Sequence, residues 1–383
     1  MKPRILILSF SAIHSDPRVM RQVRLLEERA TLTVAGYGTA PAARCEFIAV
    51  PRKRATLANR GGWALTLLLA RFERYYWNRP EVQAARRLLD GRKFDLVIAN
   101  DNATLPLALE LAKGKPVLAD AHEYSPREFD DMLLWRLLFS PYQDYLCRTY
   151  LPRAAAMSTV CQGIADAYRA NYAVAPTVVM NTPAYQALRP SSVVDGKVRM
   201  IHHGIAIRSR HLEVMIDVMA HLDSRFSLDL MLVESDAAYM RDLQARAAPD
   251  PRIRFVPPVR MEDICVHINS YDVGIYLLPP VNFNHEHALP NKFFEFIQAR
   301  LAVAIGPSPE MARIVRQYGL GAVAASFEPV ELARELTRLA ERGLPACKQA
   351  AHEAAFELCY ERSAQTLLDQ IDGLLGTAVV STA

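Results

Sequence analysis

The chain has 383 residues, of which 51% are hydrophobic and 22% are charged, and its formal net charge is +4. This length suits two domains of ordinary size, and the composition excludes a disordered or fibrous protein. So small a net charge gives no reason to expect a nucleic-acid-binding protein.

The six cysteines are spread along the chain without a CxxC pair, which predicts reduced thiols rather than disulfides or a metal site. The N-terminus leads directly into a strand-like run at residues 4–8 instead of the apolar segment of a signal peptide. No segment approaches the roughly 18 uncharged apolar residues of a membrane-spanning helix. We therefore expect a cytoplasmic protein, for which any contact with the inner membrane is peripheral.

Short, almost continuously apolar runs alternate with longer helical patterns through the first half of the chain. This alternation predicts β-α-β units and a parallel sheet covered by helices on both faces, which is an α/β, doubly wound domain. The predicted strands lie at residues 5–8, 31–35, 47–50, 96–99, 117–119, 157–160 and 178–180.

The chain becomes polar and irregular from Thr182 to Gly196, which indicates a linker. A second alternation follows, with predicted strands at residues 198–201, 228–233, 253–256, 273–278, 302–305 and 322–325. We predict a first Rossmann-like domain over residues 1–182 and a second over residues 183–356. The C-terminal helix, residues 357–383, has no strand after it and is expected to fold back on the first domain.

Two segments of the first domain carry candidate site residues. Asp16 precedes Pro17 at a predicted helix start, where its carboxylate can cap the helix, and capping alone explains its presence. Arg18 belongs to the same segment and either contacts a ligand or forms a surface ion pair. His122 and Glu123 end a predicted central strand, at the edge where open α/β sheets place ligands. A histidine there is either structural or a residue that contacts the ligand.

The segment from Pro51 to Arg87 has nine basic and two acidic residues with aromatic residues between them. This pattern suits a surface for anionic lipid head groups. It equally suits a solvated helix with an aromatic core stripe. Single-stranded nucleic acid is disfavoured because the rest of the chain is comparatively acidic.

In the second domain, Pro290 opens a predicted helix at the sequence Leu-Pro-Asn-Lys. The amides of Asn291, Lys292 and Phe293 would then be unpaired donors at a positive helix end, which suits a pyrophosphate. The Lys292 ammonium adds charge, and Glu295 one turn later can accept hydrogen bonds from a ribose. The alternative is an ordinary solvated Lys–Glu pair on a helix that packs through its phenylalanines.

Four segments, in order, resemble the bacterial group 1 (family 4-like) GT-B glycosyltransferases. Residues 15–21 are similar to the family's SDPRVxR loop, and residues 120–123 are similar to its DAHE signature. The segment from Gly204 to Arg210 is similar to its G-R…K element, and residues 289–295 to its LPNKxFE segment. The resemblance covers nearly the whole chain and implies two Rossmann-like domains that face each other across a cleft.

The resemblance also implies roles for individual residues. His122 would lie against the donor sugar near the reaction centre, and Glu295 would bind the nucleotide ribose. Arg208 or Arg210 would neutralise the pyrophosphate, because Ile205 stands where the family often has arginine; the spacing from Gly204 favours Arg210. On the acceptor side the implied residues are Asp16, Arg18 and Glu123.

One departure from the family concerns a second glutamate. Relatives carry two glutamates separated by seven residues, and counting back from Glu295 reaches His287, with Glu286 beside it. The loop from His285 to His287 could contact the donor sugar or be incidental surface. Its His-Glu-His sequence is not a credible metal site, because adjacent side chains splay apart.

The predicted function is transfer of a sugar from a nucleotide-sugar to a glycan or lipid-linked acceptor, in bacterial surface polysaccharide or glycoconjugate synthesis. The resemblance implies retention of anomeric configuration. No DxD motif lies at a suitable place, and Asp130 and Asp131 fall inside a predicted helix. We therefore expect metal-independent catalysis and no cofactor beyond the nucleotide-sugar. If the reaction inverts, the base is expected among Asp16, His122 and Glu123. Two alternatives are a GT-B nucleotide-sugar epimerase and a catalytically silent nucleotide-sugar-binding scaffold.

Overall fold

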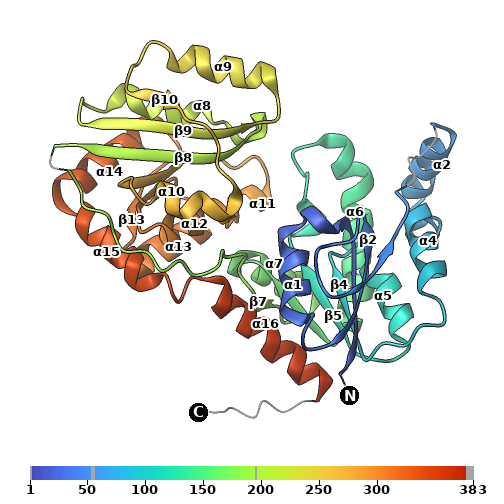
Figure 1. Cartoon of the computed structure of the whole chain (residues 1–383). Coiled ribbons are helices and arrows are strands. Elements are labelled where there is room, and N and C mark those ends of the chain that lie inside the picture. Colours follow the sequence, from blue (N-terminus) through green and yellow to red (C-terminus); the bar gives the residue numbers. More distant parts are fainter. Residues whose placement is uncertain (1, 53–56, 195, 377–383) are drawn as a thin grey trace. The chain divides into compact units, whose positions relative to one another are not determined.

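The computed structural model describes residues 2–52, 57–194 and 196–376. The described residues form two compact units: unit 1 comprises 2–179, 282–284 and 364–376, and unit 2 comprises 180–281 and 285–363 (Figure 1). Residues 53–56 of the basic and aromatic stretch, and residues 377–383 of the expected C-terminal helix, lie outside the described residues. The sequence suggested a boundary after residue 182 and a return to the first domain from residue 357.

The sheet of unit 1 has seven parallel strands in the order β3-β2-β1-β4-β5-β6-β7 within the described residues. These strands are β1 (Arg4–Ala12), β2 (Thr31–Tyr37), β3 (Glu46–Ala49), β4 (Leu96–Asn100), β5 (Val117–Ala121), β6 (Ala156–Thr159) and β7 (Thr177–Val178). The helices are α1 (Pro17–Leu26), α2 (Leu57–Leu68), α3 (Phe72–Trp77), α4 (Pro80–Leu89), α5 (Leu105–Ala112), α6 (Leu133–Tyr150) and α7 (Gln162–Tyr172).

The sheet of unit 2 has six parallel strands in the order β10-β9-β8-β11-β12-β13 within the described residues. These strands are β8 (Val198–Ala206), β9 (Phe226–Glu234), β10 (Ile253–Phe255), β11 (Val273–Tyr276), β12 (Ala302–Ile305) and β13 (Gly321–Val323). The helices from α8 onward are α8 (Glu213–Val218), α9 (Ala237–Ala247), α10 (Ile264–Ile268), α11 (Phe283–Glu286), α12 (Asn291–Gln298), α13 (Pro309–Tyr318), α14 (Pro329–Arg342), α15 (Leu344–Ala354) and α16 (Tyr360–Leu375).

The strands that the sequence predicted are confirmed, and so is the α/β class. Central strands such as β4 and β12 are buried at every residue, because helices cover both faces of each sheet. The last helix, α16, joins unit 1 from residue 364, where Leu367 and Ile371 pack into the same core as Ile5 and Leu96.

Each sheet reverses its strand order once, and each reversal marks an expected ligand site. In unit 1 the order turns between β1 and β4, and in unit 2 it turns between β8 and β11. Ligands of open α/β sheets bind beyond the carboxyl ends of the strands at such a switch point. The candidate site residues are therefore sought after β1, β4 and β5 in one unit and after β8, β11 and β12 in the other.

Candidate functional site

Helix α12 begins beyond the carboxyl end of β11 and is held tightly against the sheet of unit 2. Its Phe293, Phe294, Phe296 and Ile297 are fully buried. Gly274 in β11 makes room for this packing, since a Cβ there would approach the Phe296 ring to 2.2 Å. The amino end of α12 is thus fixed at the switch point of the sheet.

Lys292, the second residue of α12, is only 7% exposed and points back to the end of β8. Its Nζ lies 3.1 Å from His202 Nε2 and 4.8 Å from the centre of the Tyr276 ring. His202 Nδ1 is 2.9 Å from the Ile275 carbonyl oxygen, which can only accept, so Nδ1 carries the proton and Nε2 accepts from Lys292.

Gly204 leaves the space that the Lys292 side chain occupies. Its φ is +135°, and a Cβ at this position would lie 2.7 Å from Lys292 Nζ. The backbone conformation therefore favours glycine at this position of β8, and the absence of a Cβ leaves room for the ammonium group.

The electrostatics of this corner disfavour positive charge. Burial and the nearby Arg210 guanidinium lower the pKa of Lys292 from 10.5 to about 7, although Glu295 acts in the opposite direction. Burial and Lys292 likewise lower the pKa of His203 to about 3 and hold the pKa of His202 well below its usual value. A buried lysine with a depressed pKa at a helix amino end is a typical candidate for an anion-binding group.

Glu295 is buried, at 8% exposure, rather than directed into solvent. Its Oε2 lies 3.4 Å from His203 Nε2, and the His203 ring meets Phe296 edge-on. Because the pKa of His203 is low, this imidazole is neutral at pH 7 and the contact is no ion pair. Glu295 lies one helical turn after Lys292 and raises the pKa of that lysine.

The two arginines after β8 differ in their surroundings. Arg208 is exposed, pairs with Asp236 and Asp242 at 3.2 and 2.8 Å, and lies over the Tyr239 ring. Arg210 is half-buried and is close enough to Lys292 to lower the pKa of that lysine. Arg210 thus lies near Lys292 at the start of α12, whereas Arg208 forms ion pairs with two exposed aspartates.

The amino end of α12 corrects one expectation. Pro290 is the N-cap and Asn291 the first helical residue. The amide of Phe293 donates to the Pro290 carbonyl at 3.0 Å, because the first turn is tight, and is not available to a ligand. Within the described residues the amides of Asn291 and Lys292 have no such acceptor one turn earlier.

In unit 1, Asp120 at the end of β5 is the centre of a buried network. It accepts hydrogen bonds from Arg18 Nε at 2.7 Å, Gln22 Nε2 at 2.6 Å and Ser158 Oγ at 2.7 Å. Arg18 also donates to the Val179 carbonyl at 2.9 Å. Burial opposes ionisation, but the Arg18 guanidinium outweighs it and holds the pKa of Asp120 well below its usual range.

His122 lies beside this network, two residues after Asp120. Its Nε2 is 3.2 Å from Asn100 Oδ1 and 3.6 Å from Asp120 Oδ2, and its Nδ1 is 3.5 Å from Asp101 Oδ2. Burial lowers the pKa of His122, but Asp101 and Asp120 outweigh burial and raise it. The ring is therefore oriented from two sides, by Asn100 and Asp120 at Nε2 and by Asp101 at Nδ1.

Of the three residues expected on the acceptor side, Asp16 and Arg18 have structural roles. Asp16 caps α1 by accepting from the amides of Arg18 and Val19, each at 3.1 Å. Arg18 is committed to Asp120. The Glu123 side chain is exposed, while its carbonyl accepts from the Tyr168 hydroxyl at 2.8 Å.

His287 is also tied to a neighbour that the sequence did not single out. Its Nδ1 lies 3.7 Å from Glu310 Oε1 in the first turn of α13. Asn100, Asp101 and Glu310 were all missed by the sequence analysis. Asn100 and Asp101 follow the predicted strand at 96–99, so the rule that selected His122 would have selected them. Glu310 gave no comparable signal, since it comes five residues after its strand.

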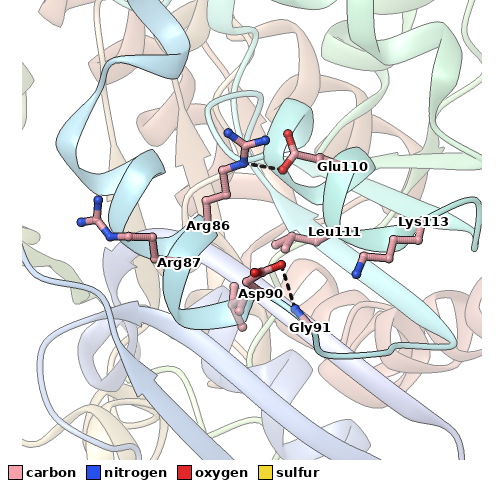
Figure 2. A pocket seen from close by; sticks show the side chains of 8 residues that line it. Arg86, Arg87, Asp90, Gly91, Glu110, Leu111 and Lys113 are labelled. Atoms are coloured by element: carbon pink, nitrogen blue, oxygen red, sulfur yellow. Dashed lines mark hydrogen bonds and ion pairs between the residues drawn. The ribbon is translucent and has the colours of Figure 1, made fainter.

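A pocket of about 340 Å³ lies elsewhere in unit 1, between the ends of α4 and α5 (Figure 2). Both helices end there before the chain enters the next strand, so the pocket is at the amino-end edge of the sheet, opposite His122. In it Arg86 Nε donates to Glu110 at 2.6 Å, and its other charged side chains are exposed. Nothing connects this pocket with the residues above.

The described residues contain no group of three or more His, Cys, Asp or Glu side chains placed to hold a metal ion. Asp130 and Asp131 lie in the turn before α6, whereas the sequence suggested a helix there, and Asp130 pairs with Arg127 at 2.6 Å. All six cysteines are free thiols. No helix among the described residues is long and apolar enough to cross a bilayer.

Comparison with known proteins found a family model that matches part of the chain. Residues 28–182 match the family model of Glycosyltransferase Family 4. No curated protein sequence matches the chain.

Solved structures with the same fold cover almost the whole chain. Sucrose-phosphate synthase from Thermosynechococcus elongatus is similar with a TM-score of 0.72 and 14% identity, over 98% of this chain and 100% of that one. HepE of Anabaena, solved with UDP-glucose, has a TM-score of 0.65 and 14% identity, over 97% of this chain and 100% of that one. The lipopolysaccharide outer core galactosyltransferase WaaB has a TM-score of 0.67 and 11% identity, over 97% of this chain and 99% of that one. At such identities the likeness establishes the GT-B fold.

Proposed function

We propose that this chain, which has the GT-B fold and matches the Glycosyltransferase Family 4 model over residues 28–182, moves a sugar from a nucleotide-diphosphate donor to a glycan or lipid-linked acceptor. The structures of HepE with UDP and with UDP-glucose support a donor of this class. The activity of WaaB in lipopolysaccharide synthesis supports a bacterial surface glycan or glycoconjugate as the product.

One observation carries the donor site: the cation pair of Lys292 and Arg210 at the amino end of α12. The two positive charges repel each other, which contributes to the low pKa of Lys292. An anion between them would remove this repulsion and would accept from the amides of Asn291 and Lys292 as well. A diphosphate fits this charge and geometry, and Glu295 is one turn away to accept from the ribose.

Catalysis follows from the charge that the reaction creates. As the glycosidic bond to the diphosphate breaks, negative charge grows on the phosphate oxygens and positive charge on the anomeric carbon. Lys292 and Arg210 stabilise the first of these charges. We assign His122 to the reaction centre on the acceptor side, where Asp101 and Asp120 orient its ring.

We further propose that the reaction retains anomeric configuration and uses no metal ion. The leaving diphosphate then helps to deprotonate the incoming hydroxyl group, and two protein cations take the place that a divalent ion would fill. Product analysis by proton NMR decides the stereochemistry, and a turnover assay with and without EDTA decides the metal question.

We also propose peripheral membrane contact through unit 1. Six leucines of unit 1 are each at least 55% exposed. They are Leu65 and Leu68 at the end of α2, Leu69 directly after it, and Leu133, Leu134 and Leu137 in the first turns of α6. The two helices contact each other, and exposed Arg71, Arg74 and Arg136 accompany these leucines. Apolar side chains with cations around them suit an anionic lipid surface, where a lipid-linked acceptor would be reached.

The membrane contact is tested by flotation with vesicles of phosphatidylcholine alone and with added phosphatidylglycerol. The triple change of Leu133, Leu134 and Leu137 to Gln should abolish binding to the anionic vesicles. Leu88→Gln is the matched control, because Leu88 is an exposed leucine of α4. Binding that survives the triple change, or a dimer in light scattering that the triple change dissociates, would contradict this proposal.

The donor site is tested by thermal shift with UDP, GDP, ADP and dTDP and their hexose conjugates, since a specific ligand raises the melting temperature. One base is expected to stabilise the protein, and Lys292→Ala is expected to lose that shift. Incubation with the donor alone, followed by analysis of the sugar, separates transfer from epimerisation. A protein that no nucleotide stabilises would refute the proposed function.

A further inference from the structure

Ser308 is the N-cap of α13, yet its hydroxyl group does not act as a cap. Serine at this position ordinarily accepts from an amide of the first helical turn. Here the side chain makes no capping hydrogen bond. The residue is 1% exposed, and Oγ has no hydrogen-bond partner among the described residues. Buried polar groups without a partner are rare, and each requires an explanation.

A second buried acceptor lies at the start of α12. Asn291 Oδ1 is inaccessible to solvent and has no hydrogen-bond partner in the described part of the chain. Helices α12 and α13 follow β11 and β12, which are adjacent parallel strands. Their amino ends therefore lie at the same edge of the sheet, the edge that also holds Lys292.

The contact between His287 and Glu310 joins these two helix starts. His287 lies four residues before Asn291, and Glu310 lies two residues after Ser308. Glu310 is 5% exposed, with Oε1 at 3.7 Å from His287 Nδ1 and Oε2 at 3.5 Å from Arg313. A buried carboxylate thus stands beside the histidine that occupies the position of the family's first glutamate.

We propose that Asn291, Ser308 and Glu310 form a subsite for the hydroxyl groups of the donor sugar, and that this subsite selects an uncharged hexose over a hexuronic acid. The inference rests on the proposed diphosphate site at Lys292. Sugar hydroxyls can donate to Asn291 Oδ1 and to Glu310, and they can donate to or accept from Ser308 Oγ. The carboxylate of a uronic acid would instead be repelled by Glu310.

The geometry also assigns a part to His287. Its contact with Glu310 holds the carboxylate at the start of α13, where the helix dipole favours negative charge. The carboxylate that position 287 lacks is therefore supplied from the next helix. His287 acts as a positioning residue and Glu310 as the group that meets the sugar.

The test is calorimetry with three probes: the nucleoside diphosphate that binds, its hexose conjugate and its hexuronate conjugate. For a uridine-specific protein these are UDP, UDP-glucose and UDP-glucuronate; for a guanosine-specific protein they are GDP, GDP-mannose and GDP-mannuronate. The wild-type protein is expected to bind the hexose conjugate at least tenfold more tightly than the hexuronate conjugate.

Ser308→Ala and Glu310→Gln are expected to weaken binding of the hexose conjugate about tenfold while the diphosphate alone binds within twofold of wild type. Glu310→Gln should also reduce the ratio of the affinity for the hexose conjugate to the affinity for the hexuronate conjugate. Ser308→Ala should leave the melting temperature of the ligand-free protein unchanged, since Oγ has no partner to lose. Ser235→Ala is the matched control: Ser235 donates to the Ala206 carbonyl, so this change should lower the melting temperature and leave the binding ratios unchanged.

The outcomes separate the subsite from the site on which it rests. Equal loss of diphosphate and hexose-conjugate binding, or no loss of either, would overturn the subsite. So would a wild-type protein that binds the hexuronate as tightly as the hexose. Failure of the wild-type protein to bind any nucleoside diphosphate would instead overturn the proposed function.

Discussion

Two buried cations of this chain lie at the carboxyl edges of two similar sheets, and their surroundings are opposite. Arg18 in unit 1 meets the Asp120 carboxylate through Nε at 2.7 Å and a second nitrogen at 2.5 Å. Lys292 in unit 2 has a neutral imidazole and an aromatic ring beside it, with Arg210 nearby. The first charge is compensated inside the protein, whereas the second has only Glu295 as a counter-charge and has Arg210 against it. The contrast is that of a structural cation with the cation that we propose binds the diphosphate.

The largest expected effect is on the stability of unit 1. Arg18→Ala would leave the Asp120 charge buried without its counterion, which costs about 3–5 kcal/mol of unfolding free energy. Urea denaturation measures this. Arg127→Ala, which removes the exposed partner of Asp130, is the control and should cost at most about 1 kcal/mol. If both changes lowered the free energy of unfolding by the same small amount, Arg18 would not be a structural counterion of Asp120.

The second expected effect is on donor binding in unit 2. Lys292→Ala should weaken the nucleotide-sugar by about 2–3 kcal/mol, because charge-assisted hydrogen bonds to the diphosphate are lost. The same change should not lower the stability of the free protein, since it removes a poorly compensated buried cation. Calorimetry and urea denaturation together test both parts. A Lys292→Ala protein that binds donor normally would show that the lysine is structural.

Arg210 and Arg208 provide a matched pair for the same measurement. Arg210→Ala should weaken donor binding in the same direction as Lys292→Ala and should raise the pKa of Lys292, because a repelling charge is removed. Arg208→Ala should change donor binding by less than about 1 kcal/mol, since its exposed ion pairs with Asp236 and Asp242 are local. Equal effects of the two changes would contradict the assignment of Arg210.

The smallest expected effect is a pH dependence from Lys292. With a pKa of about 7 in the free protein, the amine is neutral at pH 8 and must take up a proton when the diphosphate binds. Donor affinity should therefore fall above pH 7, by up to about tenfold, or roughly 1.4 kcal/mol, per pH unit. Calorimetry at pH 8 in two buffers of different ionisation enthalpy measures the proton uptake, which Lys292→Ala should abolish.

The same pKa has a consequence for stability, with a definite sign. Between pH 7 and 10.5 the unfolded state holds a proton on Lys292 that the folded state lacks, so the free energy of unfolding from this group rises with pH. Below pH 7 both states are protonated and the penalty is constant. Stability that fell with pH across this window, relative to Lys292→Ala, would contradict a depressed pKa.

The fold could be predicted because its signals are local. Continuous apolar runs such as residues 96–99 and 302–305 gave the buried strands, and their alternation with helices gave two parallel sheets. Asp16 and Pro17 marked the start of α1 correctly. Asp130 and Asp131 were misplaced into a helix, because the apolar sequence that begins α6 carries no capping residue to show where the helix starts.

The candidate site was predictable only as a set of strand ends and helix starts. The sequence alone predicted that Lys292 lies in the first turn of a helix after a buried strand, with Glu295 one turn later. Only the tertiary structure decided that Lys292 is directed to Gly204 and His202, that Arg208 is directed outward, and that Glu310 meets His287. The periodicity of apolar residues in the sequence indicates which face of a helix or strand is buried. It does not indicate which charged groups surround a side chain, because these come from residues distant in sequence. Those groups, together with burial, set the pKa of the side chain.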